Sequence, residues 1–163
     1  MKKLIHIIIS LLTTINISLS QQKNDNHYDS LKQKADVLWE NRKFYESADY
    51  YIMAGEYELK KSNPNYFKIS DSYGNAGYCY DDLGKYEKAI EFYEIALKYA
   101  QMISDSSEIS TLNSNIALSY FKLGKYDLAT QYLNNSLEID KALNNKEGMA
   151  TNYNALGKIY EIW

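Results

Sequence analysis

Histidine, cysteine and proline are scarce in this sequence, and each scarcity excludes a class of protein. The two histidines, His6 and His27, lie near the N-terminus, so the rest of the chain has no imidazole for a Ser-His-Asp triad or for general-base catalysis. The single cysteine, Cys79, excludes an internal disulfide and is expected to be a small buried side chain. One proline and seven glycines are too few for a loop-rich, all-β chain. We therefore expect a helical protein that is not an enzyme and has no cofactor.

Clusters of basic residues are also lacking. The formal net charge is −3, and a mildly acidic chain without a basic patch is poorly suited to binding nucleic-acid phosphates. Tyrosine, in contrast, occurs 17 times. We interpret most of these tyrosines as packing residues of a repeated structure.

The N-terminal segment has the layout of a secretory signal peptide. Lys2 and Lys3 precede a mostly apolar run that ends at Leu19, and Ser18 and Ser20 stand at the −3 and −1 positions before Gln21. The run is too short and too interrupted for a typical membrane-spanning helix, although an uncleaved anchor is the alternative. We predict a signal peptide at 1–20, a polar spacer at 21–29, and an exported protein that is periplasmic or secreted.

From residue 30 onward, the spacing of apolar residues predicts consecutive helices. Between Lys85 and Ala100 the apolar residues step by three and four, which gives one buried face. The preceding helix is expected to start at Asn63 as its N-cap, with Pro64 in the first helical position, and to end at Gly84. The same pair of helices is expected again at 107–124 and 125–143.

A repeated motif supports this pairing. Leu-Gly-Lys-Tyr occurs at 83–86 and at 123–126, each time with an alanine three residues after the tyrosine. The fuller copy contains Tyr73, Ala76, Gly77, Tyr80, Leu83, Gly84, Tyr86, Ala89, Tyr93 and Ala96. The next copy contains Asn113, Ile116, Ala117, Tyr120, Leu123, Gly124, Tyr126, Ala129, Leu133 and Ser136. A degenerate first copy contains Ala35, Trp39, Tyr45, Ala48 and Ile52, with Lys43 in place of the turn glycine, and a last copy contains Tyr153, Leu156, Gly157 and Tyr160.

These residues resemble the tetratricopeptide repeat (TPR) family over about residues 30–163. The resemblance implies an all-α fold of tandem antiparallel helix pairs, stacked as a right-handed superhelix (an α-solenoid), because no helix pair can bury its apolar face alone. The period is close to 40 residues, which is longer than the usual 34. In this respect the chain resembles a long-period variant of the family that is found in exported bacterial proteins.

The last copy matches a first helix without its second helix. We expect about three helix pairs plus this unpaired helix, with Tyr160, Ile162 and Trp163 on an apolar face that nothing covers. We interpret the chain as the front of a longer protein. The alternatives are a partner that completes the stack and self-association through this uncapped C-terminal helix.

In the TPR family, the first helices line a concave face that binds peptides. Carried over to this sequence, the family's contact positions are Asp71, Asn75, Tyr78, Asp82, Asn115, Leu118, Phe121 and Lys122. Asn75 and Asn115 share one repeat position, where an amide can both donate to and accept from a peptide backbone. The family's basic clamp for a terminal carboxylate is missing, which favours a neutral, basic or partly apolar ligand over an acidic tail.

The sequence thus predicts a non-catalytic protein- or peptide-binding scaffold of the bacterial cell envelope, with no nucleic-acid or metal ligand. Membrane attachment is expected only if the N-terminal segment is uncleaved or the chain continues. The alternative is the extracytoplasmic sensory segment of a membrane-bound signalling protein, such as a histidine kinase or a transcriptional regulator.

Overall fold

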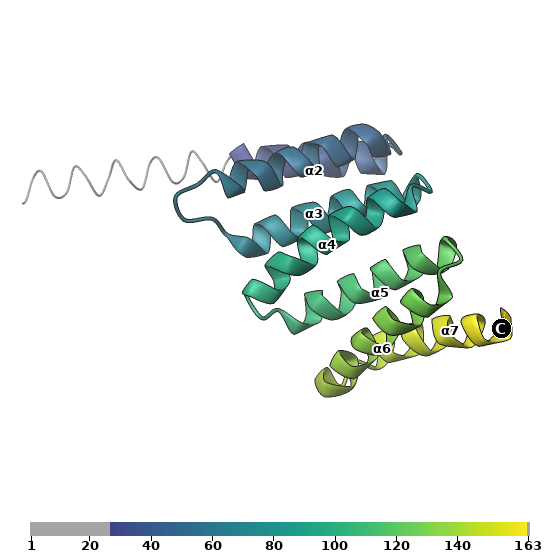
Figure 1. Cartoon of the computed structure of the whole chain (residues 1–163). Helices are drawn as coiled ribbons and strands as arrows, with labels where there is room; N and C mark the ends of the chain where they lie inside the picture. Colours follow the sequence, from purple (N-terminus) through teal and green to yellow (C-terminus); the bar gives the residue numbers. More distant parts are fainter. Residues whose placement is uncertain (1–26, 163) are drawn as a thin grey trace, which may run out of the picture.

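The structure, a computed structural model, describes residues 27–162, which form helices joined by short turns. A first helix at 27–40 is followed by α2 (Phe44–Leu59), α3 (Tyr66–Asp82), α4 (Tyr86–Met102), α5 (Ser106–Lys122), α6 (Tyr126–Leu143) and α7 (Lys146–Ile162). The helices stack in chain order, with the second helix of each pair in front of the first in Figure 1. Each helix packs mainly against its neighbours in sequence. The expected α-solenoid is therefore confirmed.

Several predictions fall outside this range. The signal peptide, residues 21–26 of the spacer, His6 and Trp163 lie outside the described residues. Residues 27–29, which we expected in the spacer, are helical, and Tyr28 is only 2% exposed. Its hydroxyl donates to Lys68 O and pairs with Ser72 Oγ, both at 3.1 Å. Because this contact joins the first helix to α3, the packed repeats begin no later than residue 27.

The turn inside each helix pair uses one residue with a left-handed backbone. Gly84 and Gly124 have φ values of +67° and +70°, which glycine adopts without the steric penalty of a Cβ. The corresponding residue of the first pair is Arg42, with φ +58°. Our placement of Lys43 at this position was therefore wrong by one residue.

That shift also corrects the register of the first repeat. Ala35 and Ala48 are fully buried as expected, but Trp39 and Tyr45 are 44% and 52% exposed. The buried tyrosine of α2 is Tyr51, which lies 42 residues before Tyr93.

Between pairs, the caps recur every 40 residues. Asn65 Oδ1 accepts from Lys68 N, Asp105 Oδ1 from Glu108 N, and Asn145 Oδ1 from Gly148 N. The predicted N-cap Asn63 was wrong, since α3 begins after Asn65. A side-chain oxygen at this position satisfies an amide of the first helical turn that has no partner within the helix.

Aromatic rings fill the core between α3 and α4. The Phe92 ring is stacked on both Tyr73 (centroids 6.2 Å apart) and Tyr80 (5.2 Å). The ring of Tyr93 covers Gly77 and is 1% exposed. Cys79 is buried, as predicted, and burial raises the pKa of its thiol.

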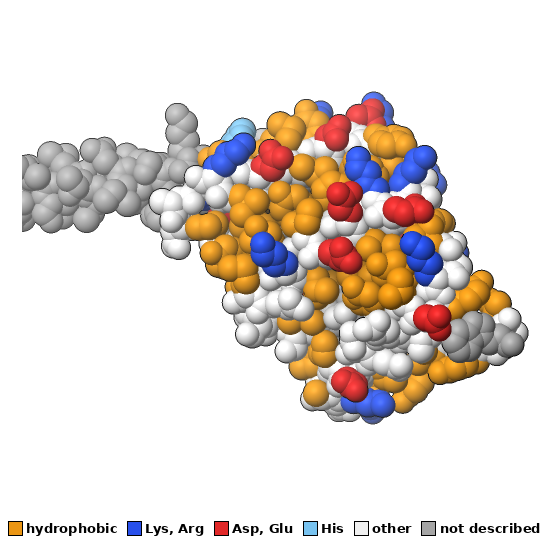
Figure 2. All heavy atoms as spheres, viewed as in Figure 1, with side chains coloured by type: hydrophobic (Ala, Val, Ile, Leu, Met, Phe, Trp, Pro, Cys, Tyr) orange, Lys and Arg blue, Asp and Glu red, His pale blue; other side chains and the backbone are white. Residues whose placement is uncertain are grey.

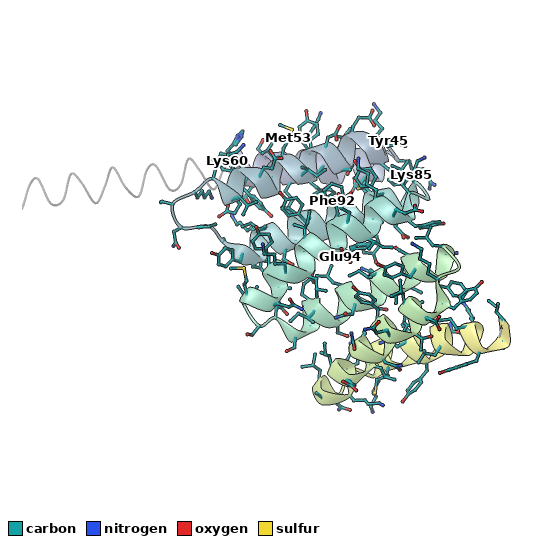
Figure 3. All side chains as sticks on the ribbon, viewed as in Figure 1. Tyr45, Met53, Lys60, Lys85, Phe92 and Glu94 are labelled. Atoms are coloured by element: carbon teal, nitrogen blue, oxygen red, sulfur yellow. The ribbon has the colours of Figure 1, made fainter. Side chains whose placement is uncertain are left out.

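The second helices form the face turned toward the viewer in Figures 2 and 3. Figure 3 labels Tyr45 and Met53 of α2, Lys60 directly after α2, and Phe92 and Glu94 of α4. Hydrophobic, acidic and basic side chains are mixed over this face, with no large area of one charge.

Candidate ligand-binding groove on the first helices

Four hollows follow one another along the first helices. The hollow between the first helix and α3 is lined by Trp39, Tyr51, Asn75 and Tyr78 and has a volume of about 360 Å³. The next, of about 140 Å³, lies between α3 and α5, and two more, of about 350 and 310 Å³, lie between α5 and α7. Neighbouring hollows share lining residues, so we treat them as one groove, called here the first-helix groove.

Tyr78 lies at the centre of this groove. It lines three of the four hollows and is 49% exposed. Its ring meets the buried Tyr93 ring edge-on, with centroids 6.1 Å apart and an interplanar angle of 88°. One side of Tyr78 is thus supported by the core, while the other offers an amphipathic ring to a ligand.

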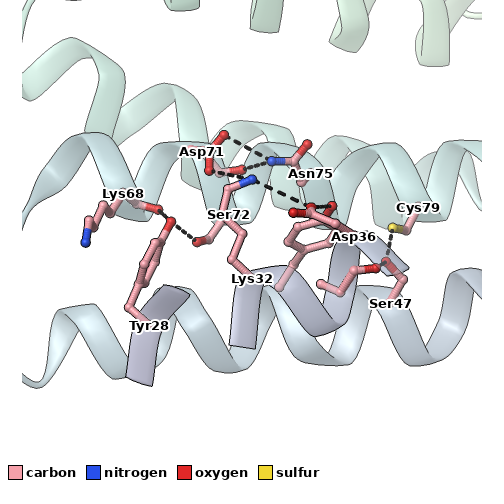
Figure 4. A network of polar contacts seen from close by, with 11 residues as sticks. Tyr28, Lys32, Asp36, Ser47, Lys68, Asp71, Ser72, Asn75 and Cys79 are labelled. Carbon is pink, nitrogen blue, oxygen red and sulfur yellow. Dashed lines mark hydrogen bonds and ion pairs between the residues drawn. The ribbon is translucent and has the colours of Figure 1, made fainter. Parts of the chain in front are cut away.

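A polar network joins the first helix to α3 beside the groove (Figure 4). Lys32 Nζ lies 3.4 Å from Asp71 Oδ2 and 3.7 Å from Asp36 Oδ1. Asn75 Nδ2 donates to Asp71 O at 2.8 Å and to Asp71 Oδ1 at 3.1 Å. Because both amide hydrogens of Asn75 are used within α3, its Oδ1 is the atom placed to accept from a ligand.

A buried carboxylate lies in the hollow between α5 and α7. Asp140 is 1% exposed and comes from the end of α6. Its Oδ1 accepts from Ser110 Oγ at 2.7 Å and from Asn145 Nδ2 at 2.9 Å, and its Oδ2 accepts from Asn152 Nδ2 at 2.8 Å. These donors belong to three structural segments, so the carboxylate joins α5, α6 and α7.

The C-terminal hollow is more apolar and carries positive charge. Leu118 and Phe121 of α5 line it together with Lys122, Ala155 and Lys158. The groove therefore changes from acidic residues, such as Asp71 and Glu108, to lysines along its length.

Two acids near the groove have raised pKa values. Burial, followed by the negative charges of Asp105 and Asp71, raises the pKa of Glu108. Burial also raises the pKa of Asp81, although the hydrogen bond from Ser119 Oγ at 2.8 Å opposes this. The Ser119–Asp81 bond connects α5 to α3 below the groove.

The structure brings most of the predicted contact residues together. Asp71, Asn75, Tyr78 and Asn115 line the smallest hollow, and Leu118, Phe121 and Lys122 line the C-terminal one. Asp82 is exposed at the end of α3 and lines none of these four hollows. Of the predicted set, it alone is separated from the groove.

Sequence reasoning missed several lining residues, including Trp39, Glu108, Asp140 and Asn152. Trp39 was assigned to the core because of the register error. Asp140 could have been found from the sequence, because the helical spacing places it on the apolar face of α6, where an acidic residue is unusual.

Among residues 27–162, no group of three His, Cys, Asp or Glu side chains is placed to hold a metal ion. No helix in this range is long and apolar enough to span a membrane.

Family models confirm the resemblance seen in the sequence. Two models described as tetratricopeptide repeat match residues 70–101 and 108–163, more than half of the chain together. The chain belongs to the tetratricopeptide repeat family. No curated protein sequence matches it significantly.

Solved structures show the same fold. BtubC from P. vanneervenii is 25% identical with a TM-score of 0.71, over 82% of this chain and 54% of BtubC, so this TPR chain spans about half of that protein. The first TPR domain of Spaghetti (RPAP3), bound to the HSP90 peptide SRMEEVD, is 20% identical with a TM-score of 0.64, over 83% of this chain and 91% of that domain. The Rap conjugation gene regulator of plasmid pLS20, in complex with the Phr peptide, is 14% identical with a TM-score of 0.71, over 82% and 37% of the respective chains.

Proposed function

We propose that this TPR chain is a non-catalytic scaffold that binds an extended protein segment in the first-helix groove. The observation that carries the proposal is the row of shared hollows, three of which Tyr78 lines. A groove with one aromatic anchor and polar side chains along its walls is typical of peptide-binding sites.

The comparisons support this function at the level of the fold. Two structures with the same fold, RPAP3 and the Rap regulator, are described with a bound peptide. Family membership and a shared fold do not fix the ligand, which depends on the side chains of the groove itself.

The charge distribution favours a ligand that is basic or neutral near its centre. Asp71 and Glu108 line the smallest hollow, and Glu147 and Asp140 line the hollow beyond it, which has no lysine or arginine in its lining. An acidic peptide such as SRMEEVD would place carboxylates against these acids, which is unfavourable in a partly desolvated groove. Apolar ligand side chains fit the C-terminal hollow, beside Leu118 and Phe121.

We infer from the N-terminal residues that the scaffold acts outside the cytoplasm. Ser18 and Ser20 provide the small residues of a cleavage site that follows an apolar run. Expression of the intact gene, followed by N-terminal sequencing of the mature protein, tests this point. A mature N-terminus at Gln21 supports export, whereas a cytoplasmic product that keeps Met1 contradicts it.

Selection from a random peptide library tests the groove. Peptides enriched on the wild-type protein are then measured against Tyr78→Ala, with Tyr45→Ala as the matched control. Both tyrosines are about half exposed, but Tyr45 lies on α2 in the face of second helices. We expect binding to weaken by about tenfold or more with Tyr78→Ala, since an aromatic anchor commonly contributes over 1 kcal/mol.

Two results would support the proposal. Enriched peptides should carry Lys or Arg, and Tyr45→Ala should bind like the wild type. Equal binding by both variants, or no enrichment at all, would exclude the groove as the binding site. A double variant, Asn75→Ala with Asn115→Ala, tests whether the two amides hold the ligand backbone.

A further inference from the structure

The hollow of about 350 Å³ between α5 and α7, called here the Asp140 hollow, is built from polar residues where another repeat has apolar ones. Three positions that are buried in both repeats change from apolar to polar. They hold Ala96, Ala100 and Leu112 at the α3–α5 junction and, 40 residues later, Ser136, Asp140 and Asn152 at the α5–α7 junction. Because a buried polar group must be hydrogen-bonded whereas an apolar one need only pack, packing alone gives no reason for this change.

Residues well inside the described chain form the Asp140 hollow. Its lining lies between Tyr78 and Asn152. The neighbouring hollow between α3 and α5 shares Tyr78 and Asn115 with it and is also open, although a complete helix pair lies on each side. The opening therefore belongs to the face of the first helices.

The carboxylate of Asp140 has no partner of opposite charge within residues 27–162. Its hydrogen-bond donors Ser110, Asn145 and Asn152 are neutral. No lysine or arginine in this range forms an ion pair with it, and none lines the Asp140 hollow. A carboxylate removed from water is stabilised by a nearby positive charge, and here the folded chain does not supply one.

The first repeat has a buried acid at the same position together with its counter-ion. Glu58 of α2 corresponds to Asp140 of α6, and the two are 2% and 1% exposed. Glu58 also contacts the cap of the next helix, because its Oε1 accepts from Asn65 N at 2.9 Å. Its Oε2 lies 2.7 Å from Lys61 Nζ. The residue of α6 that corresponds to Lys61 is Leu143, so α6 lacks the cation that balances the buried acid of α2.

Asp140 also keeps an unused acceptor site. Its Oδ1 accepts two hydrogen bonds, but its Oδ2 accepts one, from Asn152, and each carboxylate oxygen can accept two. A Cβ at Gly148 would overlap Oδ2, and both residues line the hollow. The glycine therefore keeps Oδ2 free of a covering side chain.

The hydroxyl groups around the hollow offer acceptors rather than donors. Thr111 and Thr151 each donate to the backbone oxygen four residues earlier, at 3.0 and 3.1 Å. Ser114 Oγ donates to Asn152 Oδ1 at 3.0 Å. Because these hydroxyl hydrogens are used inside the protein, the oxygens are left to accept from a ligand. The exposed carboxylate of Glu147 adds another acceptor to the lining.

We propose that the Asp140 hollow binds the guanidinium group of an arginine in the segment held by the groove. A guanidinium is positively charged and has five N–H donors and no acceptor, which matches a lining of acceptors around an unbalanced carboxylate. Its plane can also lie on the ring of Tyr78, which lines the same hollow. This inference rests on the function proposed above and names the ligand residue that the Asp140 hollow selects.

The peptides enriched by the library selection are the probes for this test. Each is synthesised with its arginine, with citrulline, which keeps the shape of arginine but not its charge, and with lysine. Fluorescence anisotropy measures their affinities for the wild type, Asp140→Asn and Glu147→Gln. Glu138→Gln is the matched control, since Glu138 is an exposed acid of α6 that does not line the Asp140 hollow.

The ratio of the arginine and citrulline affinities is the decisive quantity, because damage to the fold weakens both peptides alike. We expect the wild type to prefer arginine by about tenfold or more, with lysine between the two. Asp140→Asn and Glu147→Gln should each lower the ratio by about threefold or more, and Glu138→Gln should leave it unchanged. Circular dichroism checks that Asp140→Asn folds, and Glu147→Gln, at an exposed position, decides the question if it does not.

Several results would overturn the inference. Enriched peptides without arginine would do so, as would a ratio near one in the wild type or a ratio that Glu147→Gln leaves unchanged. A lysine peptide that binds as tightly as the arginine peptide would exclude guanidinium recognition. In each case, weaker binding to Tyr78→Ala would still support the groove, whereas no enrichment at all would overturn both the groove and this inference.

Discussion

The ring of Tyr93 lies against the backbone of Gly77, so that a Cβ at position 77 would fall 2.6 Å from Cδ1 and 2.7 Å from Cε1. This contact sets how closely α3 and α4 approach. Tyr93 is 1% exposed and its ring has no open side into which it can move. The pair therefore explains why a residue with low helix propensity stands in the middle of α3.

Gly77→Ala should destabilise the protein. Alanine is favoured over glycine in a helix by about 1 kcal/mol, but forcing a methyl group into a filled core commonly costs about 1–3 kcal/mol. Because the clash here is with ring atoms rather than a mobile chain end, we expect the free energy of unfolding to fall by about 1–2 kcal/mol. Urea unfolding monitored by circular dichroism measures this change. An unchanged or raised midpoint would contradict the prediction, because the strain would then cost no more than the gain in helix propensity.

Gly157→Ala should have the opposite effect. The position is helical, and a Cβ there meets no atom within 4 Å. Only the propensity difference remains, so the free energy of unfolding should rise by about 0.5–1 kcal/mol. The same urea titration applies, and Gly157→Ala serves as the matched control for Gly77→Ala. Destabilisation by this variant would contradict the open surrounding of Gly157.

Asp140→Ala should be the most damaging single substitution near the groove. It removes the acceptor of hydrogen bonds from Ser110, Asn145 and Asn152, and a buried donor without a partner costs about 1–3 kcal/mol. We expect a loss of about 2–4 kcal/mol, concentrated where α5, α6 and α7 meet. Thermal and urea unfolding measure the loss, and hydrogen exchange locates it.

Glu138→Ala is the control for this prediction. Glu138 is exposed on the same helix, so its removal should change stability by about 0.5 kcal/mol or less. Equal effects of the two substitutions would mean that the Asp140 hydrogen bonds contribute little.

The second and third repeats could be predicted from the sequence because their turns contain glycine. Gly84 and Gly124 mark the ends of helices, and the apolar spacing then fixes which faces are buried. In the first repeat, Arg42 adopts the left-handed backbone, so no glycine marks the turn and the register shifted by one residue. Because one residue turns a helix by about 100°, the shifted register placed Trp39 and Tyr45 in the core, whereas both are exposed in the structure.

The groove was predictable only where it depends on helix periodicity. Asn75, Tyr78 and Asn115 lie on one face of the first helices because their repeat positions put them there. Asp140 reaches the groove from α6, between two first helices, and this depends on the spacing of the stacked pairs. The periodicity of a single helix does not determine the spacing between stacked helix pairs.

Glu108→Gln should stabilise the protein at neutral pH. Burial and the neighbouring charges of Asp105 and Asp71 raise the pKa of Glu108 in the folded state. Folding therefore favours the protonated form of Glu108. Its contribution to stability is fully present below the pKa that Glu108 has in the unfolded chain, and it is lost as the pH rises through the higher pKa that Glu108 has in the folded state. Glutamine keeps the neutral form at every pH.

We expect the Glu108→Gln variant to be more stable than the wild type at pH 7 and nearly equal to it at pH 3, as measured by urea unfolding at both pH values. Glu138→Gln, at an exposed position of α6, controls for the added amide. A variant that is less stable at pH 7, or a difference that grows as pH falls, would show that ionised Glu108 is favoured by the fold.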